Sequence, residues 1–79
     1  MRRVGYIKKD GFVETEDGLI FHLPKRGTDD EGYAEVLIDA TSIGLRGSFQ
    51  RQSIKPLIGK KCEFVTNNNK FGYNFTIIN

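Results

Sequence analysis

The side chains that most often perform catalysis are scarce in this sequence. It contains one histidine, His22, and one cysteine, Cys62, so the usual four-ligand zinc site cannot be assembled within the chain. It also lacks a glycine-rich phosphate-binding loop that ends in Lys-Ser or Lys-Thr. His22 lies in an apolar segment before a proline, where a structural or surface histidine is commoner than a general base. We therefore expect a protein that is not an enzyme and that binds no cofactor and no metal.

Carboxylates gather in two acidic segments, residues 14–17 and residues 29–31. Such groups can bind a cation or exchange protons, but neither segment has the spacing of a calcium-binding loop. Both segments are typical of solvated turns. The alternative is that they form an interface with a protein partner or mimic nucleic acid.

Basic residues are concentrated in the second half of the chain, beside aromatic residues. Residues 1–40 carry six basic and nine acidic residues, a net charge of −3, whereas residues 41–79 carry six basic residues and one acidic residue, a net charge of +5. A basic region that also holds aromatic rings favours an anionic partner. The whole chain carries only +2, so a mixed, solvated surface is the alternative.

The pattern at the C-terminal end predicts a β-hairpin. Residues 61–66 and 70–78 read as two strands, and the three asparagines between them favour the left-handed backbone of a tight turn. Cys62 alternates with Phe64, so both are expected in the core. Because side chains on a strand alternate between faces, one face of the last strand should carry Phe71, Tyr73, Phe75 and Ile77. Of these we assign Phe75 and Ile77 to the core.

The N-terminal third predicts three strands joined by two tight turns. Asp10-Gly11 and Asp17-Gly18 are strong signals for two-residue hairpin turns. They separate strands over residues 2–9, 12–16 and 19–23. Pro24 ends the third strand because it has no N–H to give to a neighbouring strand.

The middle of the chain is less regular. Residues 24–32 are polar and predict an exposed loop. Residues 33–40 favour a strand, although Tyr33 and Leu37 are also spaced as on a helix. Residues 41–58 show no sustained period and predict a long loop with one helical turn near residues 53–57. Loops of this length in small domains are often functional.

Together these elements predict one all-β domain over residues 1–79, a small barrel of five or six short strands. A chain of this length can bury only one core, and a closed sheet is an efficient way to build it. The OB-fold is the leading candidate and an SH3-like barrel is the alternative. A single cysteine allows no internal disulfide, and the sequence shows neither a signal-peptide pattern nor an apolar run of about 20 residues. We expect a cytoplasmic protein without membrane contact.

Three short motifs resemble those of the cold-shock domain. Residues 9–18, Lys-Asp-Gly-Phe-Val-Glu-Thr-Glu-Asp-Gly, resemble the first nucleic-acid-binding motif of that family with its acidic turn. Residues 19–22, Leu-Ile-Phe-His, are similar to the second motif, and residues 57–65 are similar to a later Leu-x-x-Gly-x-x-Val-Glu-Phe run. The resemblance implies a five-stranded OB barrel that binds single-stranded RNA or DNA through aromatics on its second and third strands.

The chain departs from this family at several points. Its first motif has one aromatic residue, Phe12, where the family has two, and its first strand offers Tyr6 in place of a tryptophan. Residues 24–56 are longer than the corresponding family segment and leave room for an extra strand. A second alignment places the second motif at residues 36–39, which carry no stacking group there.

These observations predict a protein that binds single-stranded RNA or DNA. Unpaired bases would stack on exposed rings while basic side chains contact phosphates, which gives affinity without strong sequence preference. The residues expected to stack or to flank the stack are Tyr6, Phe12, Phe21, His22 and Tyr73. The residues expected to contact phosphates are Lys8, Lys9, Arg46, Arg51 and Lys70.

The competing hypothesis is a small protein-interaction or inhibitor module, such as an accessory or mobile-element factor. It would bind a protein partner through the acidic segments or through the 41–58 loop, where Phe49 lies between Arg46 and Arg51. We expect a monomer or a homodimer, because an exposed final strand can pair with a second copy.

Overall fold

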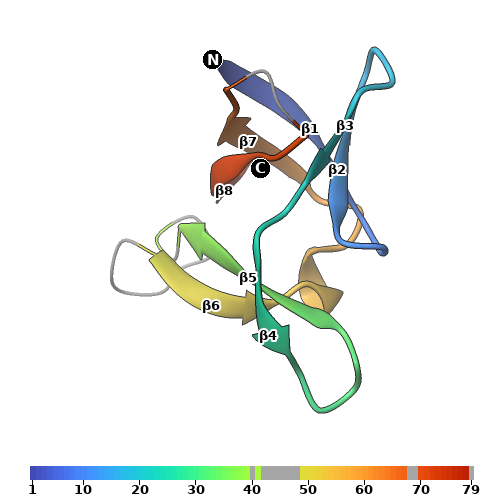
Figure 1. Cartoon of the computed structure of the whole chain (residues 1–79), viewed down its shortest axis with the longest axis vertical. Helices are drawn as coiled ribbons and strands as arrows, with labels where there is room; N and C mark the ends of the chain where they lie inside the picture. The colour runs from blue at the N-terminus through green and yellow to red at the C-terminus, as the bar shows by residue number, and fades with distance from the viewer. Residues whose placement is uncertain (40, 42–48, 68–69, 79) are drawn as a thin grey trace.

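The computed structural model describes residues 1–39, 41, 49–67 and 70–78. This part of the chain is all-β, and its strands form one strongly curled sheet (Figure 1). The strands are β1 (Arg2–Lys8), β2 (Phe12–Thr15), β3 (Ile20–His22), β4 (Lys25–Thr28), β5 (Ala34–Asp39), β6 (Phe49–Ser53), β7 (Lys61–Val65) and β8 (Tyr73–Ile77). A short 3-10 turn, Lys55–Leu57, precedes β7.

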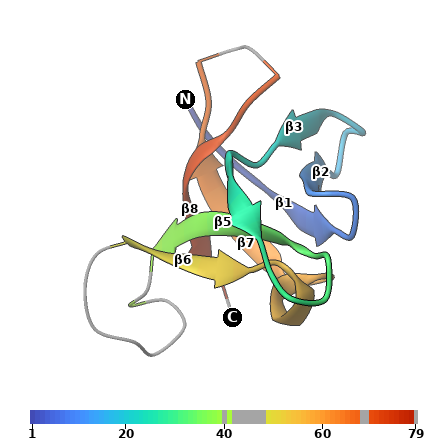
Figure 2. The same cartoon turned by 60° about the horizontal axis from the view of Figure 1, so that its bottom comes forward.

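The strand order is β3-β2-β1-β7-β8-β5-β4, and β6 pairs with β5. Among the described residues, the strands pair with one another in antiparallel fashion except for the short parallel contact between β5 and β8. An isolated bridge at the end of β3 is also parallel. Figures 1 and 2 show β4, β5 and β6 as one unit beside the strands β1, β2, β3, β7 and β8. The expectation of a small, all-β, barrel-like structure is confirmed, but the described residues form eight strands and not the five or six expected.

The sheet curls until the end of β3 meets the chain just before β8. His22 and Phe71 form a parallel β-bridge, which we call the closing bridge. The His22 N–H donates to the Lys70 carbonyl at 2.6 Å, and the Gly72 N–H donates to the His22 carbonyl at 3.1 Å. This contact brings together two segments about 50 residues apart in the sequence.

Both Asp-Gly turns form where the sequence predicts them. Gly11 and Gly18 have φ values of 86° and 84°, a left-handed conformation that glycine adopts without steric cost. The Gly11 N–H donates to the Lys8 carbonyl and the Gly18 N–H donates to the Thr15 carbonyl, at 3.1 and 3.0 Å. The turns fix the register of β1, β2 and β3, so alternate residues of these strands face the core.

Phe64 lies at the centre of the core and is fully buried. Its ring centroid is 5.2 Å from that of Phe21 and 5.4 Å from that of Phe75. The expected core positions Cys62, Phe64, Phe75 and Ile77 are confirmed. The remaining buried apolar residues of this cluster are Ile7, Val13, Phe21, Leu23, Val36, Ile38, Ile54 and Leu57.

The middle of the chain holds more strand than expected. The strand over residues 33–40 and the turn near residues 53–57 are confirmed by β5 and the 3-10 turn. The loops expected over residues 24–32 and 41–58 are corrected, because they contain β4 and β6. Both strands lie beside β5, and all four residues of β4 are exposed. Without an inward-facing apolar residue, β4 has no alternation that would reveal it.

The acidic segment at residues 29–31 closes the turn between β4 and β5. The N–H groups of Glu31 and Tyr33 donate to Asp29 Oδ1 at 2.9 and 2.8 Å. The Ser53 hydroxyl donates to Asp29 Oδ2. This bond, together with the two backbone donors, lowers the pKa of the Asp29 carboxyl. Asp29 therefore connects the turn to the end of β6.

Candidate functional site

Four side chains, three of them candidates from the sequence, form a continuous row across the outer face of the sheet. Lys8 is opposite Phe12, Phe12 is opposite His22, and His22 is opposite Phe71 through the closing bridge. Directly opposed side chains on neighbouring strands lie about 5 Å apart and on the same face. The row therefore combines one cation, two phenylalanine rings and an imidazole.

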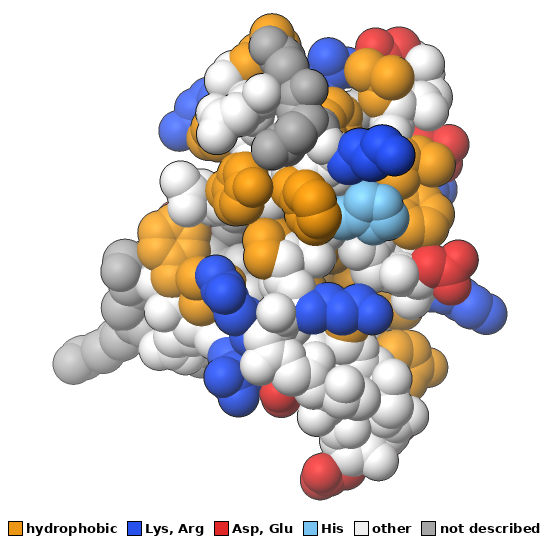
Figure 3. Space-filling view, in the orientation of Figure 1, with side chains coloured by type: hydrophobic (Ala, Val, Ile, Leu, Met, Phe, Trp, Pro, Cys, Tyr) orange, Lys and Arg blue, Asp and Glu red, His pale blue; other side chains and the backbone are white. Residues whose placement is uncertain are grey.

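A second row lies one step along the same strands. Tyr6 is opposite Glu14 on one side and Lys61 on the other, and Glu14 is opposite Ile20. We call the two rows together with Tyr73 the aromatic face; its members are Tyr6, Lys8, Phe12, Glu14, Ile20, His22, Lys61, Phe71 and Tyr73. Figure 3 shows hydrophobic side chains and basic side chains gathered around the histidine on this side of the molecule.

The rings of the aromatic face are accessible to a ligand. Tyr6, Tyr73 and Ile20 are exposed, and Phe71 has 47% of its surface exposed. Phe12 is half-buried. The rings of His22 and Phe71 lie 5.9 Å apart, centroid to centroid, with 49° between their planes. At this distance the two rings form a continuous, uneven surface over the closing bridge.

A bulge in β8 separates the exposed rings from the core rings of the same strand. Glu63 is opposite Thr76 and Val65 is opposite Tyr73, so the register shifts by one residue between these pairs. Asn74 lies in this shift with a left-handed φ of 57°. An extra residue in a strand reverses which side chains face inward beyond it. Phe71 and Tyr73 consequently face solvent, while Phe75 and Ile77 face the core.

This bulge corrects the expectation that all four side chains share one face. Asparagine tolerates the left-handed conformation better than most residues because its short side chain can bond locally. The sequence showed the alternation but not the place where it shifts.

The backbone around Phe71 is held by several contacts. The buried Thr66 hydroxyl donates to the Phe71 carbonyl at 2.9 Å. On either side of Phe71, Lys70 and Gly72 exchange hydrogen bonds with His22. Gly72 is buried, and a Cβ at this position would come within 2.6 Å of the Phe64 ring. A residue with a side chain would displace that ring, so glycine allows the aromatic face to lie directly over the core.

A hollow of about 530 Å³ adjoins the aromatic face at Tyr6. Val4 and Tyr6 give it apolar surface, and Arg2 and Lys61 add positive charge. The turn between β2 and β3 contributes Glu16 and Asp17. Its volume is in the range of small-ligand sites.

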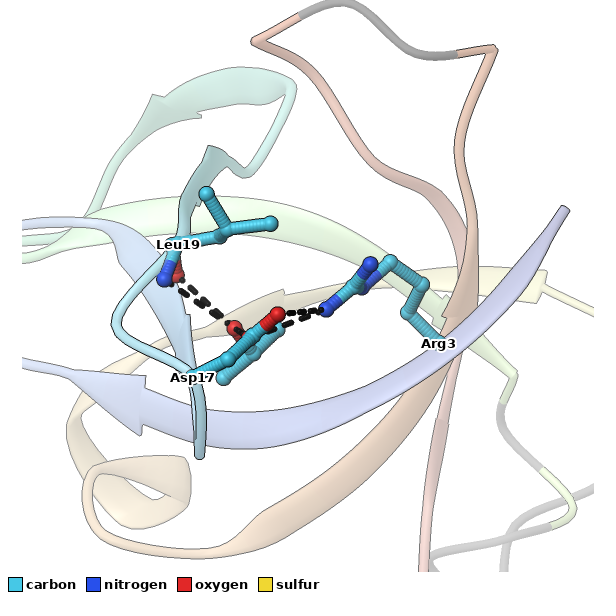
Figure 4. Close-up of polar contacts among 4 residues, drawn as sticks. Arg3, Asp17 and Leu19 are labelled. Carbon is cyan, nitrogen blue, oxygen red and sulfur yellow. Dashed lines mark hydrogen bonds and ion pairs between the residues drawn. The ribbon is translucent and has the colours of Figure 1, made fainter.

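Asp17 is bound into a network that connects the β2–β3 turn to β1 (Figure 4). Arg3 Nη2 donates to both carboxylate oxygens of Asp17 at 2.9 Å, and the Thr15 hydroxyl donates to Oδ1. The Leu19 N–H donates in turn to Thr15 Oγ1 at 3.1 Å. The Thr15 bond and then the Arg3 guanidinium lower the pKa of the Asp17 carboxyl.

The structure brings together only part of the predicted site. Tyr6, Lys8, Phe12, His22 and Tyr73 belong to the aromatic face; Lys9 lies exposed in the β1–β2 turn, and Lys70 is exposed beside the closing bridge. Arg51 lies on β6, where it pairs with Glu35 at 3.9 Å. Arg46 lies outside the described residues.

Phe21 is a correction to the predicted stacking set. It is only 7% exposed, and its ring packs on Phe64 inside the core. The guanidinium of Arg3 covers the ring at 5.6 Å from its centroid. In β3 the alternation places Ile20 and His22 on the outer face and Phe21 inside, because a barrel this small needs its large apolar groups in the core.

Sequence reasoning missed four members of the face, which are Phe71, Ile20, Lys61 and Glu14. The sequence did identify residues close to Phe71, because Lys70 and Tyr73 were both predicted to bind nucleic acid. Its contact with His22 depends on the closing bridge, which joins distant segments and leaves no local signal. Ile20 and Lys61 follow from strand register alone once the pairing of β1 is known.

The described residues include the single cysteine and the possible metal ligands of this part of the chain. Cys62 is buried, and loss of hydration raises the pKa of its thiol to about 12, which disfavours the reactive thiolate. No group of three or more His, Cys, Asp or Glu side chains within the described ranges could hold a metal ion. The described part of the chain also contains no helix long and apolar enough to cross a membrane.

A comparison with known protein families, characterised proteins and solved structures found no match to the chain.

Proposed function

We propose that the protein binds single-stranded nucleic acid on the aromatic face, without catalysis. The observation that carries this proposal is the cross-strand row of Lys8, Phe12, His22 and Phe71. Every base has a π-face, so a line of exposed rings can stack consecutive unpaired bases. A duplex hides these base faces within its own stack, so we expect single strands to be preferred.

We further propose that the curled sheet is an OB-type barrel related to cold-shock domains. The pairing of β1 with β2 and β7, and the parallel contact after β3, support a five-stranded ring in which β8 is the last strand. OB-folds bind oligonucleotides on the face of their second and third strands, which here are β2 and β3. The strands β4, β5 and β6 are then an insertion between the third and fourth strands of the ring.

The charges around the aromatic face fit a ligand whose phosphates follow its rim. Lys8 and Lys61 lie at the ends of the two rows on the β1 and β7 side. Lys9 is exposed in the β1–β2 turn, and Lys70 is exposed next to Phe71. Lysine side chains at these positions can neutralise phosphates while the rings hold the bases.

A protein partner remains the competing hypothesis, but the acidic segments support it weakly. Asp17 is bonded to Arg3, Asp29 is occupied by three donors, and Glu31 pairs with Lys55. Carboxylates engaged in this way hold turns together. The charge pattern of an acidic nucleic-acid mimic would require them to be free for a partner.

The proposal is tested by fluorescence anisotropy of labelled single-stranded DNA and RNA, each titrated at low and at physiological salt. Phe12→Ala and Phe71→Ala should each weaken binding about 5- to 150-fold, because a stacked base contributes about 1–3 kcal/mol. Phe49→Ala is the matched control, since Phe49 is 40% exposed but lies on β6. The affinity of the Phe49→Ala variant for the oligonucleotides should stay within about twofold of the wild-type value.

Failure of the folded protein to bind any single strand at low salt would overturn the proposal. An equal loss of affinity in Phe49→Ala and Phe71→Ala would also contradict it, because binding would then not be located on the aromatic face. Capture of a protein partner by the chain would become the next experiment.

A further inference from the structure

A single carboxylate lies in the middle of the aromatic face. Glu14 has Tyr6 and Ile20 as its direct cross-strand neighbours, and Phe12 precedes it on the same face of β2. Its side chain is 44% exposed. A ligand that stacks on Tyr6 or Phe12 would therefore meet this carboxylate.

The charge of Glu14 is unfavourable for a phosphate but favourable for a base edge. A carboxylate repels the phosphate backbone, so the backbone of a bound strand should keep to the lysines at the rim. An ionised carboxylate also only accepts hydrogen bonds. A base beside Glu14 must therefore present N–H donors to it.

Distances within the sheet allow this contact. Phe12 and Glu14 are two residues apart on one strand, which places their Cα atoms about 6.6 Å apart. Tyr6 and Glu14 are direct neighbours across strands, with Cβ atoms about 5 Å apart. A base stacked over either ring can direct its Watson–Crick edge along the surface toward the carboxylate.

Resting on the proposed function, we infer that Glu14 selects guanine at one position of the bound strand. Guanine presents two adjacent donors, N1–H and the N2 amino group, which match the two oxygens of a carboxylate. Thymine and uracil present one N–H between two carbonyl oxygens, which the carboxylate repels. Adenine and cytosine each present one amino group beside a ring-nitrogen acceptor. Their affinity should therefore lie between that of guanine and that of thymine or uracil.

The ion pair between Glu14 and Lys8 does not prevent this role. The two charged groups are 3.7 Å apart, and both side chains are nearly half exposed. Exposed pairs of this kind contribute little to stability. Binding would exchange the pair for a base edge on Glu14 and a phosphate on Lys8.

The test uses short thymidine oligonucleotides in which one central base is guanine, hypoxanthine, adenine, cytosine or thymine, with the RNA equivalents in parallel. A bidentate contact discriminates by about 5- to 150-fold, so the guanine strand should bind at least about fivefold more tightly than the thymine strand. Hypoxanthine lacks the N2 amino group and should lose much of this advantage.

Glu14→Gln and Glu16→Gln provide matched variants that remove the same charge. In Glu14→Gln the guanine-to-thymine affinity ratio should fall to near one, because the amide presents only one acceptor. Glu16 lies in the adjoining turn, outside the two rows, so Glu16→Gln should leave the ratio unchanged. Circular dichroism would verify that both variants are folded.

The outcomes separate this inference from the function on which it rests. Equal binding of all strands, or a ratio that Glu14→Gln leaves unchanged, overturns the selection of guanine while nucleic-acid binding stands. No binding of any strand overturns both.

Discussion

Phe71 and Phe75 are the same residue type four positions apart, but they have different environments. Phe71 is 47% exposed and Phe75 is fully buried against Phe64. Residue type therefore does not decide which rings can stack on a ligand. The decisive property is the direction in which each side chain leaves the sheet.

This difference predicts opposite effects of truncation on stability. Phe75→Ala removes a buried ring and should lower the free energy of unfolding by about 3–5 kcal/mol. Phe71→Ala should cost less than half as much, because much of its ring is already in water. Urea denaturation of the two variants measures this difference. Equal losses would show that Phe71 is a core residue and would remove it from the proposed binding surface.

Asp17 gives a prediction about pH. The Thr15 hydroxyl and the Arg3 guanidinium hold the pKa of its carboxyl below the ordinary value of 3.8. A lowered folded-state pKa stabilises the fold above pH 3.8, and this contribution is lost as the pH falls through the folded-state pKa. Asp17→Asn should therefore be less stable than the wild type at neutral pH, with the difference disappearing in acid.

Urea midpoints measured at neutral pH and well below pH 3.8 test this expectation. Asp10→Asn makes the same charge change in the other Asp-Gly turn and serves as the control. A stability difference between Asp17→Asn and wild type that persists unchanged in acid would show that the network does not depend on the ionised carboxylate.

At the residue scale the sequence predicted four core positions correctly. Cys62, Phe64, Phe75 and Ile77 were assigned to the core because their spacing matches a strand. Phe21 was wrongly placed on the surface because the motif resemblance outweighed its own alternation with Ile20 and His22. The alternation of residues 20–22 alone predicts that Phe21 faces the core.

At the element scale, the bulge in β8 determines which rings are exposed. Asn74 adopts a φ of 57°, which Gly accepts freely and a β-branched residue resists. Asn74→Gly should therefore keep the stability of the wild type to within about 1 kcal/mol. Asn74→Val should lose about 1–2 kcal/mol, the approximate cost of a side chain in this conformation.

Chemical denaturation of these two variants, followed by oligonucleotide titration, tests the role of the bulge. If the strand relaxes to a regular alternation in Asn74→Val, Tyr73 turns away from the face and affinity should fall with stability. Equal stability of the Gly and Val variants would show that the left-handed conformation is not required.

Tight turns were predictable and edge strands were not. Each Asp-Gly pair carries its own structural signal, so β1, β2 and β3 were located from the sequence. The sequences of β4 and β6, Lys-Arg-Gly-Thr and Phe-Gln-Arg-Gln-Ser, lack a clean apolar alternation. They are strands because β5 offers hydrogen-bonding partners on both edges.

At the scale of the whole molecule, the binding surface depends on closure of the sheet. The row from Lys8 to Phe71 exists only because the end of β3 meets the segment before β8. No local pattern in the sequence specifies a contact between residues 22 and 71. The sequence could therefore predict the strands and turns that carry the candidate surface. It could not predict every residue that belongs to that surface.

The most direct test of the account is a two-dimensional amide NMR titration of the protein with a short single-stranded oligonucleotide. Binding on the aromatic face predicts shift changes concentrated in β1, β2, β3 and residues 70–74, with β4 and β6 little affected. Shift changes confined to β4, β5 and β6, or no changes at saturating oligonucleotide, would contradict the account.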